Sequence, residues 1–207
     1  MARRNRKRRP ARREPQRDPK RRLLVVCEGI VTEPVYLRGL ERWAGNSRIH
    51  LEIPKEQGDP KKLVEIAKRH KRNAEDEAKR QRDDFLSFDE VWCVCDVDEH
   101  QRLPDARQMA RDNDIMIAVS NPCFELWLVL HFRDSPGPQH RHDMQKLLAK
   151  FLEGYDKHLD FSALSHGVQS AVVRAQRLDE MAQEEGEGGR NPTTDVYRLA
   201  ESILAVR

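Results

Sequence analysis

The stretch VVCEGIVTEPVYLRGL, Val25–Leu40, changes from an apolar run to a helical pattern within a few residues. The apolar run, residues 22–28, is too short for a core helix and is followed by a glycine, which is typical of a buried strand. Thr32 then stands at an expected N-cap, and residues 33–44 carry a first-turn proline and apolar side chains at helical spacing. The stretch therefore predicts a strand, a turn and a helix.

Apolar segments and helical patterns continue to alternate along the chain. Three further strands are predicted at residues 48–53, 88–98 and 115–120. Helices are predicted at 60–82, 104–114 and 121–132, and after a Pro-, Gly- and His-rich loop at 135–142 further helices are predicted at 143–153, 168–185 and 193–206. Strands that alternate with helices indicate parallel strands joined by right-handed crossovers. We therefore predict an α/β fold with a parallel four-stranded sheet flanked by helices and a C-terminal helical addition.

A strongly basic segment precedes this pattern. Residues 1–22 hold 12 lysines and arginines but only two acids, a net charge of about +10, whereas the rest of the chain is about −7. Three prolines and the lack of apolar periodicity leave this segment without the means to form a core. We expect a disordered basic tail at 1–21, an α/β core at 22–134 and a helical region at 135–207 that packs on the core.

The basic tail is a candidate for nucleic-acid contact. Basic tails bind phosphate backbones without reading sequence, because binding releases condensed counterions. The alternatives are a solubilising tail, or a tail that docks on the acidic body of the protein. The nucleic-acid contact is assigned to Arg3, Arg4, Arg6, Lys7, Arg8, Arg9, Arg12 and Arg13.

Composition argues against several other classes of protein. No apolar run approaches the roughly 20 residues needed to cross a bilayer, and no signal-like apolar block follows the basic N-terminus, so we expect a cytoplasmic protein without a membrane partner. All four cysteines lie in apolar segments, and Cys93 and Cys95 share one strand face, which is poor geometry for a zinc site. Buried, reduced thiols are the expected state.

Acidic residues stand at the ends of two predicted strands. Glu28 closes the first strand, and Asp96 and Asp98 close the third. Because the carboxyl ends of parallel strands meet at one edge of a sheet, we expect these three side chains to lie close together. Their oxygens suit Mg²⁺ or Mn²⁺, which would neutralise phosphate charge and lower the pKa of a bound water. For each residue alone, ordinary solvated turn chemistry is the alternative.

Four other polar residues have two interpretations each. Glu33 is a candidate metal ligand or general base, although the helix macrodipole also favours an acid in a first turn. Glu125 lies among apolar neighbours, where a carboxylate needs a hydrogen-bond partner or a raised pKa, and it is either functional or structural. Asn121 is expected to cap the helix at 121–132, and His131 is expected to be a core histidine rather than a functional one.

Four blocks of the chain resemble the signature blocks of the RloB-like proteins, bacterial proteins often encoded beside an AAA-type ATPase in restriction and antiphage loci. The blocks are LLVVCEGIVTEPVYLRGL, VWCVCDVDEH, SNPCFELWLVLHF and NPTTDVYRLAESIL, in order from about Arg22 to Leu204. That family is regarded as similar to the Toprim fold, in which a glutamate after the first strand and an Asp-x-Asp after the third bind Mg²⁺ for phosphoryl transfer. The resemblance implies that Glu28 is this glutamate and that Asp96 and Asp98 are this pair.

The resemblance also implies a function. It favours a Mg²⁺-dependent Toprim-like nuclease that cleaves RNA such as tRNA, or DNA, in antiphage defence under the control of an AAA-type ATPase partner. Two alternatives stay open, a non-catalytic adaptor or regulatory subunit of an ATPase-containing complex and a metal-dependent hydrolase or synthase of small nucleotides, and so does self-association into a homo-oligomer. The candidate catalytic residues are Glu28, Glu33, Asp96, Asp98 and Glu125.

Overall fold

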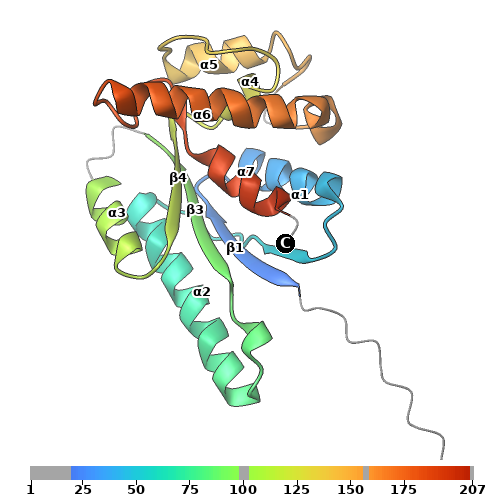
Figure 1. Ribbon diagram of the computed structural model, residues 1–207, viewed down its shortest axis with the longest axis vertical. Coiled ribbons are helices and arrows are strands. Elements are labelled where there is room, and N and C mark those ends of the chain that lie inside the picture. Colours follow the sequence, from blue (N-terminus) through green and yellow to red (C-terminus); the bar gives the residue numbers. More distant parts are fainter. Residues whose placement is uncertain (1–19, 98–102, 156–158, 206–207) are drawn as a thin grey trace, which may run out of the picture.

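A five-stranded sheet forms the centre of the computed structural model, which describes residues 20–97, 103–155 and 159–205 (Figure 1). The strands lie in the order β2-β1-β3-β4-β5. Their bounds are β1 (Arg21–Cys27), β2 (Ile49–Glu52), β3 (Glu90–Asp96), β4 (Met116–Asn121) and β5 (Thr193–Thr194). The first four strands are parallel and β5 is antiparallel to β4, so the predicted α/β class is confirmed.

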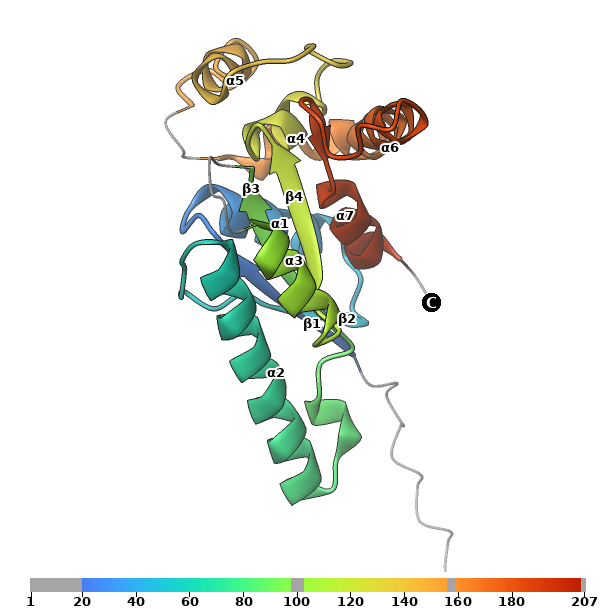
Figure 2. The same cartoon turned by 90° about the vertical axis from the view of Figure 1, so that its left-hand side faces the viewer.

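Helices cover both faces of this sheet (Figures 1 and 2). One face is covered by α2 (Pro60–Gln81) and α3 (Leu103–Arg111). The other face is covered by α1 (Thr32–Ala44) and α7 (Val196–Leu204) (Figure 1). Three further helices pack into the same apolar cluster but lie beyond the carboxyl ends of the strands (Figures 1 and 2): α4 (Glu125–Val129), α5 (Arg141–Leu148) and α6 (Val168–Glu184). Short 3-10 helices lie in the connections at Asp84–Leu86, Phe161–Ala163 and Ser165–Gly167. None of the described helices is long and apolar enough to cross a bilayer.

The apolar run of β1 is continuous because both of its faces are buried. Leu23, Val25 and Cys27 pack into the apolar cluster on the α1 side. Leu24 and Val26 pack into the cluster on the α2 side. A strand of a parallel sheet that is covered on both faces reads as an unbroken apolar sequence. The chain's four cysteines are likewise buried, and all are free.

The strand count differs from the prediction, because the segment predicted as a helix at 193–206 begins with β5. Thr193 and Thr194 pair with the end of β4, and the Thr194 hydroxyl lies 2.8 Å from that of Ser120. The Asp195 backbone N–H then donates to the Val119 carbonyl, and α7 begins only at Val196. A strand of two residues is too short to produce an alternating pattern, so the sequence could not separate it from the helix.

The buried helix predicted at 121–132 is also shorter than expected. Asn121 does not cap it, because β4 continues through Asn121, which pairs with Thr193 of β5. The Asn121 side-chain amide donates instead to the Gly189 carbonyl at 2.9 Å. Helix α4 therefore starts at Glu125, and this shift places Glu125 in its first turn.

Candidate active site at the carboxyl edge of the sheet

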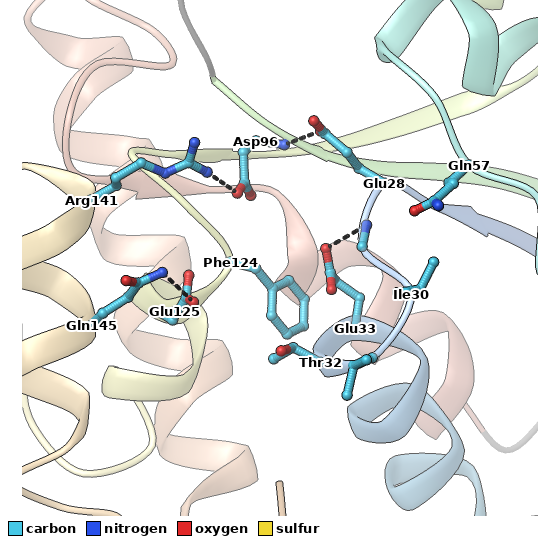
Figure 3. Close-up of a pocket in the computed structure, with 12 residues that line it drawn as sticks. Glu28, Ile30, Thr32, Glu33, Gln57, Asp96, Phe124, Glu125, Arg141 and Gln145 are labelled. Atoms are coloured by element: carbon cyan, nitrogen blue, oxygen red, sulfur yellow. Dashed lines mark hydrogen bonds and ion pairs between the residues drawn. The ribbon is translucent and has the colours of Figure 1, made fainter. Parts of the chain in front are cut away.

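A pocket of about 310 Å³ opens beyond the carboxyl ends of β1 and β3 (Figure 3). Four carboxylates line it, together with one arginine and a glutamine from α5: Glu28, Glu33, Asp96, Glu125, Arg141 and Gln145. In open α/β sheets this edge is the usual place for a ligand. The pocket is therefore the candidate active site.

The register of β1 and β3 brings Glu28 and Asp96 together. Cys27 is paired with Val94, and the Glu28 backbone N–H continues the ladder by donating to the Val94 carbonyl at 3.0 Å. The Glu28 carboxylate in turn accepts a hydrogen bond from the Asp96 backbone N–H at 3.1 Å (Figure 3). The structure thus brings together these two predicted site residues. The third, Asp98, lies outside the described residues, as do the eight basic residues assigned to the tail.

Glu33 belongs to both the turn and the pocket. The Gly29 backbone N–H donates to the Glu33 carboxylate at 3.0 Å, and a Cβ atom at Gly29 would lie 2.2 Å from the second carboxylate oxygen. Only a glycine leaves room for this contact. Thr32 is not the N-cap that its position predicts: it is the first helical residue, and Val31 precedes it without a side-chain cap. The side-chain hydrogen bond to the turn comes from Glu33, whose carboxylate accepts from the Gly29 backbone N–H.

Asp96 lies close enough to the other pocket carboxylates for their charges to act on it. Burial raises its pKa well above the usual range, and the charges of Glu33, Glu125 and Glu28 raise it further. Arg141 opposes this effect, because its guanidinium lies 3.0 Å from an Asp96 oxygen. Among the described residues that line the pocket, Arg141 is the only cation.

Glu125 has the hydrogen-bond partners that a carboxylate among apolar neighbours requires. It is 7% exposed, and its carboxylate accepts hydrogen bonds from the Gln145 amide at 3.2 Å and the Tyr155 hydroxyl at 3.4 Å. Burial and the charge of Glu125 raise the pKa of Tyr155, so this hydroxyl stays a donor. Burial likewise raises the pKa of Glu33, and the negative charges of Glu125 and Glu28 add to that effect.

The donor chemistry of the pocket fits a hard divalent cation. Mg²⁺ and Mn²⁺ prefer carboxylate oxygens, and a cation would reduce the repulsion that raises the pKa values of Asp96 and Glu33. Within the described ranges, no group of three or more His, Cys, Asp or Glu side chains is arranged to hold a metal ion. Because Mg²⁺ keeps several waters, it needs only one or two carboxylates from the protein.

Sequence reasoning missed Arg141 and Gln145. It placed residues 135–142 in a loop and began the next helix at 143, whereas α5 begins at Arg141. The His140 side chain accepts a hydrogen bond from the His142 backbone N–H, which is an unusual cap and gave no recognisable start signal. The i, i+4 spacing of Arg141 and Gln145 on one helix face was the signal that could have found the pair.

His131 lies in the core, as its apolar context predicts. Its Nε2 is 3.0 Å from the Tyr36 hydroxyl and its Nδ1 is 2.9 Å from the Trp127 carbonyl. Nδ1 therefore carries the proton that it donates to the carbonyl, and Nε2 accepts from the hydroxyl. Burial lowers the pKa of His131 to about 4, so the ring is neutral at physiological pH.

The fold and the pocket define an α/β protein with an acidic, ligand-sized cavity at the carboxyl edge of a mostly parallel sheet. The family model described as RloB-like protein matches residues 23–203, and the chain belongs to this family. No curated protein and no solved structure matches the chain significantly.

Proposed function

We propose that this RloB-like protein is a Mg²⁺- or Mn²⁺-dependent nuclease that cleaves phosphodiester bonds in RNA such as tRNA, or in DNA, as part of antiphage defence. The observation that best supports the proposal is the convergence of Glu28 and Asp96 from the ends of neighbouring strands on one acidic pocket. Parallel strand ends with several carboxylates are a common setting for metal-assisted phosphoryl transfer.

Each carboxylate has a distinct role in this proposal. Glu28, Asp96 and Asp98 would hold the cation, which would neutralise phosphate charge and lower the pKa of a bound water. Burial raises the pKa of Glu33, and in this proposal its carboxylate is the general base that accepts a proton. Glu125, which is fixed by Gln145 and Tyr155, adds negative charge that favours a cation in the pocket.

The proposal also includes binding of the nucleic acid by the basic tail and control by a protein partner. The basic residues of the tail, from Arg3 to Arg13, would hold the phosphate backbone by charge without selecting a sequence. An AAA-type ATPase is the proposed partner that controls access or activity, as the family resemblance implies.

Cleavage by the full chain, alone and together with an AAA-type ATPase as the proposed partner, tests the proposal. RNA and DNA pools are incubated with Mg²⁺ or Mn²⁺, and the expected result is metal-dependent cleavage that Asp98→Ala abolishes. Asp143→Ala is the matched control, because Asp143 is an exposed acid of α5 that pairs with Lys146 on the helix surface. Equal cleavage by Asp98→Ala and the wild type would remove the assigned site.

A second candidate function is a non-catalytic adaptor of an ATPase-containing complex. The ion pair between Arg141 and Asp96 favours this candidate, because it satisfies a proposed metal ligand within the protein. Copurification of the ATPase with a chain that binds no Mn²⁺ and supports no cleavage would establish the adaptor.

A hydrolase or synthase of small nucleotides is the third candidate. A cavity of about 310 Å³ lies at the small end of the range for small-molecule sites. Removal of residues 1–19 separates this candidate from the nuclease: small-nucleotide turnover would survive the truncation, whereas binding of a nucleic-acid polymer would weaken.

A further inference from the structure

Helix α5 places two hydrogen-bond donors in the acidic pocket. Arg141 and Gln145 lie one turn apart, so their side chains share one face of the helix. Arg141 reaches Asp96, and Gln145 reaches Glu125 (Figure 3). Each donor thus contacts a carboxylate that comes from a different element of the core.

The two members of the Arg141–Asp96 pair differ in their access to solvent. The Arg141 side chain is 37% exposed, whereas the Asp96 side chain is 15% exposed. The guanidinium is therefore the more accessible of the two groups to an anion from solvent. The planar guanidinium matches the oxygens of a phosphate, to which it can donate two parallel hydrogen bonds.

A divalent cation at Asp96 would change the partner of Arg141. The cation and the guanidinium would compete for the same carboxylate charge, so the ion pair would weaken when the cation binds. A phosphate that arrives with the cation would offer the Arg141 guanidinium a second anionic acceptor beside Asp96. Arg141 would then exchange one anion for another.

We propose that Arg141 binds the phosphate of the substrate, and that it leaves Asp96 for that phosphate when a divalent cation occupies the pocket. The inference rests on the proposed function, since it uses the same pocket and the same metal. It adds a residue of α5 to the site and assigns it a second task, the protection of Asp96 until metal and substrate arrive. Gln145 acts as a positioning residue that fixes α5 to Glu125.

Two affinities measured on the full chain test this proposal. Calorimetric titration with Mn²⁺ alone gives the first, and titration of the Mn²⁺-loaded protein with inorganic phosphate gives the second. In Arg141→Ala, Mn²⁺ affinity should rise about threefold because the competing charge is gone. Phosphate affinity should fall about tenfold because a charged bidentate donor is lost. Arg141→Lys should fall between the wild type and Arg141→Ala in both titrations.

Lys146→Ala is the matched control. Lys146 is a cation of the same helix, but its side chain is 76% exposed and pairs with Asp143 on the helix surface. The control should leave both affinities unchanged, which separates the effect of Arg141 from a general loss of positive charge on α5. If Arg141→Ala is unstable, Arg141→Gln keeps a polar side chain, removes the charge and supports the same comparison.

The outcomes distinguish this inference from the proposed nuclease. Phosphate affinity that is unchanged in Arg141→Ala, or Mn²⁺ affinity that falls, overturns the role of Arg141 whatever the cleavage assay gives. Absence of Mn²⁺ binding in the wild type overturns both proposals. Opposite changes in the two affinities, in a protein that cleaves no nucleic acid, support Arg141 as the phosphate ligand and overturn the nuclease alone.

Discussion

Helix α4 carries a polar residue near each end, and the two residues have opposite surroundings. Glu125 begins the helix and faces the pocket, where its charge helps to raise the pKa values of Glu33 and Asp96. His131 follows the helix end and has a hydrogen-bond partner for each ring nitrogen. Both side chains are buried, at 7% and 5% exposed. Burial alone therefore does not distinguish a polar residue of the pocket from one of the core.

The two residues differ in whether uncompensated charge surrounds them. His131 is neutral and connects α4 to α1 through Tyr36, so it stabilises the packing of two helices. The carboxylates around Glu125 repel one another, and this repulsion costs stability in the free protein. Groups with strongly shifted pKa values in a cavity are typical of functional sites. The comparison predicts that substitutions at the two ends of α4 change stability in opposite directions.

The largest effect is expected when a pocket carboxylate is substituted and cleavage activity is measured. Asp96→Asn should reduce metal-dependent cleavage about 1,000-fold, a loss of about 4 kcal/mol of transition-state stabilisation, because the metal loses a charged ligand. Thermal denaturation should show a folded protein with little loss of stability, since the substitution also removes a repelled charge. Cleavage at the wild-type rate would mean that Asp96 has no part in the chemistry.

The next effect concerns the core end of α4. His131→Ala should lower the free energy of unfolding by about 3 kcal/mol, because it leaves a cavity and a buried Tyr36 hydroxyl without its acceptor. Urea denaturation measures the change. Cleavage per folded molecule should stay at the wild-type level, and a matching loss of activity would place His131 in the functional site after all.

The sequence predicts the strand ends of the pocket better than its α5 side, and the reason is physical. The meeting of Glu28 and Asp96 follows from parallel pairing, because each residue ends a strand that its apolar pattern makes visible. Arg141 and Gln145 reach the pocket only through the packing of α5, which no local pattern specifies. β5 was missed because two residues carry no period. Local periodicity thus located the strands, and tertiary packing completed the site.

A smaller effect is expected at His131 for the pH dependence of stability. The pKa of His131 is about 4 in the fold and ordinarily 6.5, so the unfolded chain binds more protons as the pH falls below 6.5. His131 should therefore cost about 2 kcal/mol of stability between pH 7.5 and pH 5. Urea denaturation of the wild type and of His131→Gln, which does not titrate, isolates this contribution from those of the carboxylates. Parallel pH profiles for the two proteins would show that His131 is not buried in the neutral form.

The smallest effect, opposite in sign, is expected for Glu125→Gln. Glutamine can keep an oxygen acceptor for Gln145 and Tyr155 but removes a charge that raises the pKa values of Glu33 and Asp96. The free energy of unfolding at pH 8 should rise by about 0.5 to 1 kcal/mol. Because both neighbouring carboxyls have raised pKa values, they take up protons in the fold as the pH falls, the repulsion disappears, and the gain should shrink by pH 5.

Urea denaturation at pH 8 and pH 5 measures that change, with Glu153→Gln as the control because Glu153 is exposed. A loss of stability at pH 8 would mean that the hydrogen bonds of Glu125 outweigh its repulsion. In that case Glu125 would be a structural residue like His131, and the contrast between the two ends of α4 would disappear. A gain that shrinks at low pH would instead show that the pocket holds its carboxylates together at the expense of stability, which is the property a cation-binding site requires before its ion arrives.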